Sequence, residues 1–132
     1  MRSRVLLIGL RSDAVDFDRW PHLTRESLKS AFEEVRSGLD ASGHASRWCL
    51  IDPGATARDE VQQALGAFEP DIVSIGAGVR ADPEHLRLFE DLVNLVHELA
   101  PGARFAFNTD PLDTIRSVDR AATRADDGAA DS

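Results

Sequence analysis

The hydrophobic and polar positions of this chain alternate between short, continuous apolar runs and longer stretches with helical spacing. Residues 4–10, RVLLIGL, are the first apolar run, which is typical of a parallel strand buried on both faces. Similar runs at residues 44–51, 71–75 and 103–108 predict three further strands. Helical patterns between and after these runs predict four helices.

The first two helices are predicted from apolar spacing together with their end signals. Thr24 stands in an N-cap position before the first helix, which is expected to end at Gly43. Thr56, with Asp59 three residues further on, resembles a capping box, so the second helix is predicted to begin at Thr56. This helix is expected to end before Pro70.

An aspartate followed by a proline precedes each of the later helices, at Asp82-Pro83 and Asp110-Pro111. The residue before a proline is pushed out of the helical region, as an N-cap must be, and a proline at the first helical position loses no hydrogen bond. Asp52 also follows a strand, so three aspartates are expected at one rim of the sheet. Helix capping is the preferred interpretation over a divalent-metal site or a general base.

The alternation of strands and helices predicts the fold class. Parallel strands joined by crossover helices give an α/β three-layer sandwich, with a four-stranded parallel sheet between two helical layers. We expect the flavodoxin-like order 2-1-3-4, in which the first and third strands lie side by side and create a switch point. Residues 1–125 are expected to form a single domain, and residues 126–132 a disordered acidic tail.

Composition and charge narrow the possible functions. The 132 residues are 42% hydrophobic and 29% charged, without an apolar run of membrane-spanning length. A net charge of −8 opposes contact with nucleic acid. The single cysteine, Cys49, excludes an internal disulfide and a cysteine-based zinc site. The first apolar run is strand-length and lacks a small-residue cleavage site, so a cytoplasmic protein with no membrane or nucleic-acid partner is expected.

The candidate site lies at the rim where the strands end. Parallel sheets of this kind bind ligands outside the carboxyl ends of their strands, next to the switch point. The turn IGAGVRADP at residues 75–83 brings two glycines there, which permit close backbone approach and lead into a helix start that favours an anion. The predicted ligand-binding residues are Arg11, Ser12, Asp13, Gly76, Gly78, Arg80, Asn108 and Thr109. They predict a pocket for a phosphate or carboxylate, the alternative being that the glycines only turn the chain.

Two further patterns bear on chemistry at this rim. The spacing Gly76-x-Gly78-x-x-Ala81 matches a dinucleotide-binding fingerprint, but the next strand ends about thirty residues later, where a dinucleotide unit would place an acidic residue about 20 residues on. The four histidines show neither a catalytic order nor metal-ligand spacing. The sequence therefore assigns no cofactor, no metal and no catalytic residue.

The connection at residues 11–23 is longer than the ~2–6 residues usual between a strand and a helix. Val15, Phe17, Trp20 and Leu23 make it more apolar than a solvated loop needs to be. We expect this loop either to fold over the switch point as a lid or to pack against a second subunit.

Two alternatives to anion binding remain open. Leu88 and Leu95 widen the apolar stripe of the third helix, which suggests an interaction or homo-oligomerisation module such as a homodimer, unless neighbouring helices cover that face. The second alternative is a small hydrolase or lyase that uses Asp13 or Asp16 as a base.

In the order of its elements, the chain resembles flavodoxin-like and receiver-like doubly wound domains. The motifs of those families differ, because the third strand ends in Gly76-Ala77-Gly78 where a receiver has a phosphorylatable Asp. The loop at residues 10–13 likewise lacks a flavodoxin phosphate loop. The strings IGAGVR at residues 75–80 and FNT at residues 107–109 resemble those of a group of small uncharacterised bacterial proteins. The resemblance in element order implies a Rossmann-like α/β fold, and the resemblance to this group implies no particular activity.

Overall fold

The computed structural model describes residues 3–15, 17–18, 20–109 and 113–131, with residues 124–131 described by their backbone alone. Within these residues the chain forms one sheet of four parallel strands in the order β2-β1-β3-β4. The strands are β1 (Arg4–Leu10), β2 (Ala45–Ile51), β3 (Ile72–Ile75) and β4 (Arg104–Ala106). The predicted α/β class and the flavodoxin-like order 2-1-3-4 are confirmed.

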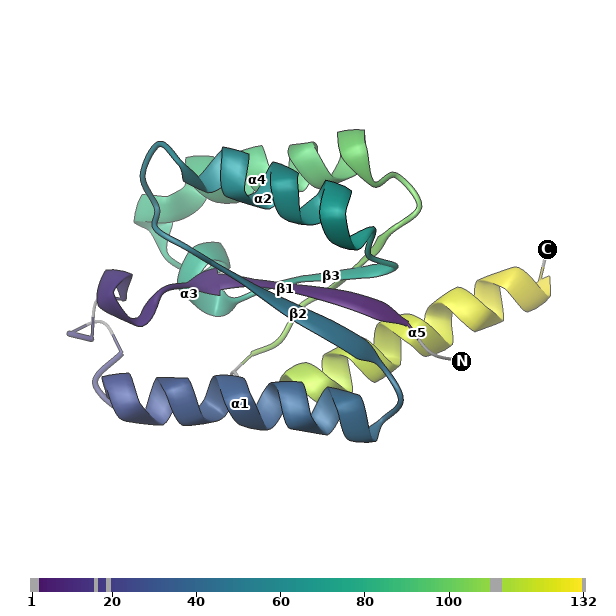
Figure 1. Ribbon diagram of the computed structural model, residues 1–132, viewed down its shortest axis with the longest axis horizontal. Coiled ribbons are helices and arrows are strands. Elements are labelled where there is room, and N and C mark those ends of the chain that lie inside the picture. The colour runs from purple at the N-terminus through teal and green to yellow at the C-terminus, as the bar shows by residue number, and fades with distance from the viewer. Residues whose placement is uncertain (1–2, 16, 19, 110–112, 132) are drawn as a thin grey trace.

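Helices cover both faces of the sheet (Figure 1). One face carries α1 (Arg25–Ala41) and α5 (Thr114–Asp131), and the other carries α2 (Ala57–Phe68) and α4 (Leu86–Leu99). Successive side chains of a strand point to opposite faces, so β1 contributes to two cores. Val5 and Leu7 pack in the core under α1 and α5, whereas Leu6 and Ile8 pack in the core under α2 and α4. Burial on both faces explains the continuous apolar run of this strand.

The first helix begins as the sequence predicts. The Thr24 Oγ1 atom accepts a hydrogen bond from the Ser27 backbone N–H at 3.0 Å, and the Ser27 Oγ atom accepts one from the Thr24 N–H at 2.8 Å. This reciprocal pair is a capping box that satisfies two N–H groups which the helix itself leaves without acceptors. Past the end of α1, Gly43 has a φ of 87°, the left-handed conformation that ends many helices.

The predicted capping box at Thr56 is wrong. α2 does follow Thr56, but this residue has helical φ and ψ of −88° and −11°, and its side chain accepts no capping hydrogen bond. An N-cap side chain reaches the first turn from an extended backbone, which Thr56 lacks. The preceding turn is held instead by Asp52, whose Oδ1 atom accepts from the Gly54 N–H at 2.7 Å.

The chain after β3 is more regular than the predicted turn. It forms the short helix α3 (Ala77–Arg80), then the 3-10 turn η2 (Pro83–His85), before α4. Asp82 caps this turn, because its Oδ1 atom accepts from the Glu84 N–H at 3.0 Å. The predicted cap at Asp82 is confirmed, whereas the Asp110-Pro111 pair lies outside the described residues.

Helix α5 continues to Asp131, through the segment for which the sequence predicts a disordered tail. Alanine has the highest helix propensity of all residues, and all five alanines of α5 lie within residues 121–130. This composition favours a helix in that segment. None of the helices in the described part of the chain combines the length and the apolar character that crossing a bilayer requires.

Candidate functional site

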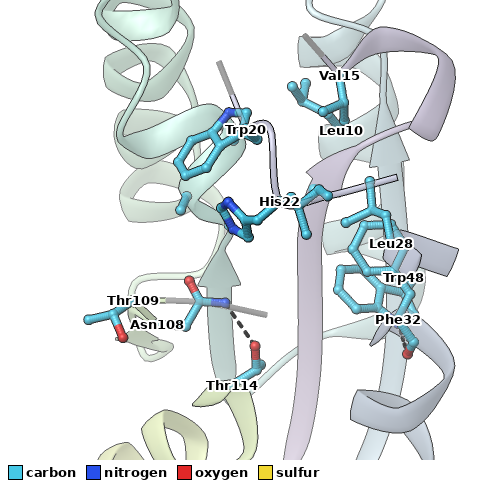
Figure 2. Close-up of a pocket in the computed structure, with 15 residues that line it drawn as sticks. Leu10, Val15, Trp20, His22, Leu28, Phe32, Trp48, Asn108, Thr109 and Thr114 are labelled. Atoms are coloured by element: carbon cyan, nitrogen blue, oxygen red, sulfur yellow. Dashed lines mark hydrogen bonds between the residues drawn. The ribbon is translucent and has the colours of Figure 1, made fainter. Parts of the chain in front are cut away.

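A cavity of about 190 Å³ lies at the carboxyl ends of the strands, on the side of the sheet that carries α1 (Figure 2). Its lining is mostly apolar, with a smaller polar part contributed by the chain after β4. The lining residues are Gly9, Leu10, Val15, Trp20, His22, Leu23, Leu28, Phe32, Trp48, Gly76, Ala77, Gly78, Asn108, Thr109 and Thr114. The cavity therefore occupies the switch point between β1 and β3, where the sequence places the site.

The sheet brings the two sides of this site together. Ile8 of β1 pairs with Ile75 of β3, and the Gly76 N–H donates to the Ile8 carbonyl at 2.9 Å. On the other side of β1, the Arg11 N–H donates to the Ile51 carbonyl of β2 at 2.9 Å. The ends of β1 and β3 are thus adjacent, while the chain that leaves β1 turns along β2.

Two aromatic rings form one wall of the cavity. Phe32 of α1 and Trp48 of β2 have ring centroids 4.4 Å apart, with their planes tilted by 40°. The indole Nε1–H of Trp48 donates to the Phe32 backbone carbonyl at 3.1 Å, so the polar atom of this ring is already satisfied. A Cβ atom at Gly9 would lie 3.3 Å from the Trp48 Cζ3 atom, so the glycine lets the indole lie against β1.

The long first loop covers the cavity from the other side. It contains the short turn η1 (Ser12–Ala14), and its residues Val15, Trp20, His22 and Leu23 all line the cavity. The rings of Trp20 and His22 meet edge to face at 6.4 Å, and Figure 2 shows His22 between Trp20 and Asn108. Of the two roles expected for this loop, its position supports that of a lid.

Asn108 lies at the polar end of the cavity and is buried, with 7% of its surface exposed. Its Nδ2 group donates to the Thr114 Oγ1 atom at 2.8 Å, and its Oδ1 atom accepts from the Arg80 guanidinium at 3.0 Å. A side-chain amide has two N–H donors, so one remains after the bond to Thr114. Next to Asn108, the hydroxyl and backbone N–H of Thr109 both donate to the Asp113 carboxylate.

Arg80 braces Asn108 and does not line the cavity. Its Nε–H donates to the Ile75 carbonyl at 3.3 Å, and its Nη2 group also donates to the Asn108 carbonyl. The guanidinium lies 5.3 Å from the centre of the Phe107 ring. Burial lowers the pKa of this guanidinium, and the nearby negative charge of Asp113 opposes that shift. Because the guanidinium is hydrogen-bonded to Asn108, its positive charge lies behind that residue, at the polar end of the cavity.

The predicted site residues fall into two groups. Gly76, Gly78, Asn108 and Thr109 come together at the cavity, whereas Arg11, Ser12, Asp13 and Arg80 do not line it. The guanidinium of Arg11 pairs with the Glu60 carboxylate of α2 at 3.4 Å, on the opposite face of the sheet. Asp13 is exposed, and Asp16, the other candidate base, lies outside the described residues.

Several lining residues are absent from the sequence prediction. Leu28 and Phe32 belong to the apolar stripe of α1, which is also the pattern of ordinary core residues. Trp48 lies within a strand, and Thr114 lies in the first turn of α5. The apolar side chains of the loop at residues 11–23 are the one local pattern in the sequence that indicates part of this lining. They include Val15, Trp20 and Leu23, which cover the cavity.

Three polar side chains outside the cavity, Cys49, His44 and His85, each have a partner within the fold. Burial, followed by the charge of Glu60, raises the pKa of the Cys49 thiol, and a protonated thiol is a poor nucleophile. His44 is buried, with its Nε2 atom 3.0 Å from an Asp119 carboxylate oxygen. His85 places its Nδ1 atom 3.0 Å from the Gly78 carbonyl. No cluster of three potential metal ligands occurs among the residues that the structure describes.

Comparison with models of known protein families gives no match, and comparison with curated proteins gives none.

Proposed function

We propose that this domain binds a small anionic molecule in the cavity between the ends of β1 and β3. The observation that carries the proposal is the cavity itself, which joins an apolar wall, a covering loop and a polar end at the switch point. Ligand sites in proteins are typically concave and mostly apolar, with a few polar groups that orient the ligand. A phosphate or a carboxylate is the anionic group that we expect the ligand to carry.

The polar end supports an anion in two ways. Asn108 retains one amide donor, and the positive charge of Arg80 lies directly behind it. These groups are donors only, which favours a ligand rich in acceptor oxygens. Arg11, paired with Glu60, has no role in this arrangement.

A thermal-shift screen of nucleotides, sugar phosphates and organic acids tests the proposal. Ligands that bind the folded state raise the melting temperature, and Gly78→Ala is expected to reduce that shift by placing a methyl group at the cavity. The added Cβ would lie 3.5 Å from the Leu10 Cδ1 atom, an ordinary contact, so the fold tolerates it. Gly66→Ala on α2 is the matched control, because its Cβ would meet nothing within 4 Å.

Three outcomes are informative. A shift that falls in Gly78→Ala and persists in Gly66→Ala supports binding at the switch point. An equal shift in both variants places binding elsewhere and contradicts the proposal. The absence of a shift with every compound in the screen also counts against it.

A second candidate function, a homodimer, is favoured by a different surface. Phe107 is 38% exposed and stacks on Phe105 at a centroid distance of 5.6 Å, next to the edge strand β4. Exposed edge strands can pair with other chains. Leu95, which the sequence suggested for this role, is buried in the core with 2% exposure, and Leu88 packs against the same core. Sedimentation of wild type and Phe107→Ser tests the dimer, which a monomer at every concentration contradicts.

A further inference from the structure

The lining of the cavity points to one class of ligand. We infer that the ligand is a single planar aromatic ring bearing a carboxylate, with the ring against Phe32 and Trp48 and the carboxylate toward Asn108. This inference rests on the proposed function, because it names the class of anion for the same cavity.

The apolar wall requires more than a small inorganic anion. Phe32, Trp48 and Leu28 present carbon to the cavity, since the only polar atom of the Trp48 ring is engaged by the Phe32 carbonyl. An inorganic phosphate would leave these side chains uncovered and would lose hydration without compensation from them. A flat ring gains both apolar burial and ring contacts, since aromatic pairs favour offset or edge-to-face packing.

The size of the cavity limits the ligand to about one ring. Its volume of about 190 Å³ is somewhat larger than the ~150 Å³ of an apolar cavity known to bind benzene. The additional space matches a small substituent on the ring. Gly9 contributes to this shape, because a Cβ atom there would lie 3.3 Å from Trp48 Cζ3 and would require the ring to shift.

The position of the polar groups gives the ligand its direction. Asn108 and Thr109 lie across the cavity from Phe32 and Trp48 in Figure 2. The remaining Nδ2–H of Asn108 can donate to one carboxylate oxygen, while Arg80 holds the Oδ1 atom and thereby fixes which edge of the amide carries donors. A ligand with its ring at one end and its carboxylate at the other matches both sides at once.

Calorimetric titration of the full chain with four probes tests this inference: benzoate, cyclohexanecarboxylate, acetate and inorganic phosphate. We expect benzoate to bind at least about tenfold more tightly than acetate, because the ring buries apolar area in addition to the shared carboxylate. Benzoate is also expected to bind more tightly than cyclohexanecarboxylate, which has a similar size and charge but no planar ring. Inorganic phosphate is expected to be the weakest of the four.

Two variants test the location of the ring. Phe32→Leu removes one ring of the wall, and Gly9→Ala moves the other, since its Cβ would lie 3.3 Å from Trp48 Cζ3. Each is expected to weaken benzoate severalfold and to leave acetate unchanged. Phe68→Leu is the matched control, because Phe68 lies on α2 beneath the Arg4 guanidinium, 4.5 Å from the ring centre. Circular dichroism verifies that each variant is folded.

The outcomes separate this inference from the proposed function. If acetate or phosphate binds as tightly as benzoate and Gly78→Ala weakens it, the aromatic class is wrong and anion binding at the switch point stands. If benzoate binds equally well to Phe32→Leu, Gly9→Ala and wild type, the ring position is wrong. If none of the four probes binds, the aromatic class is overturned, and the wider screen decides the proposed function.

Discussion

Arg80 donates to the Oδ1 atom of Asn108 at 3.0 Å, which ties the short helix α3 to the end of β4. The same guanidinium donates to the Asn108 backbone carbonyl and to the carbonyl of Ile75. Three acceptors on two strand ends are thus held by one side chain. Arg80 therefore positions Asn108, which lines the polar end of the cavity.

Arg80→Ala is expected to lower the free energy of unfolding by about 1–3 kcal/mol, because it leaves buried acceptors of Asn108 without a donor. Arg80→Lys is expected to recover only part of this loss, since an ammonium group cannot form the same planar set of bonds. Urea denaturation measures both. Arg87→Ala, an exposed residue of α4, is the control and is expected to change little. Equal effects of the Arg80 and Arg87 variants would contradict a stabilising role of the bonds between Arg80 and Asn108.

Replacement by alanine is expected to affect stability differently at the two threonines that precede α1 and α2. Thr24→Ala removes a capping hydrogen bond and is expected to cost about 1 kcal/mol. Thr56→Ala is expected to be close to neutral, because the Thr56 side chain makes no capping bond. Thermal or denaturant unfolding of the two variants distinguishes these cases. If Thr56→Ala lowers stability as much as Thr24→Ala, Thr56 does cap α2, as the sequence suggests.

Two helical glycines form a second matched pair. Gly66→Ala on α2 is expected to stabilise the fold by about 0.5–1 kcal/mol, because alanine has the higher helix propensity and its Cβ would lie in open space. At Gly38 on α1, a Cβ would overlap the side chain of Ile115 on α5. Crowding of that kind costs about 1–3 kcal/mol, so Gly38→Ala is expected to be destabilising. Stabilisation by both variants would mean that the Ile115 side chain moves aside at little cost.

Because the Cys49 thiol is buried, the stability of the fold is expected to depend on pH in the alkaline range. Burial raises the pKa of Cys49 in the folded chain above its ordinary value of 9.0. Between the two pKa values the folded state binds more protons than the unfolded state, so stability falls as pH rises through this range. Relative to Cys49→Ala, wild type is therefore expected to lose stability above about pH 9 and to show a constant difference below about pH 8. A constant difference up to pH 10 would argue against the shift.

The sequence was sufficient for features with local causes. The apolar run of β1, the Thr24 cap and the Asp82 cap each depend on residues within a few positions, and each appears as predicted. The switch point also follows from the order of the elements, since right-handed connections leave few arrangements for four parallel strands.

The side-chain partners at the site depend on distant pairings. Arg80 was predicted as a ligand residue because it follows the glycine turn, whereas its partner Asn108 lies 28 positions away. The aromatic wall also depends on residues that are distant in the sequence, because Phe32 lies on a helix and Trp48 on a strand, and the two meet above Gly9. Neither pairing leaves a local pattern that composition or periodicity would detect.

The placement of the tryptophans makes the protein a reporter of its own site. The chain contains two tryptophans and no tyrosine, and both tryptophans, Trp20 and Trp48, line the cavity from opposite sides. Its tryptophan fluorescence therefore originates entirely at the proposed binding site. Trp20→Phe and Trp48→Phe would divide this emission into the signal of the loop and the signal of the sheet, so a change on either side of the cavity can be followed separately without any added label.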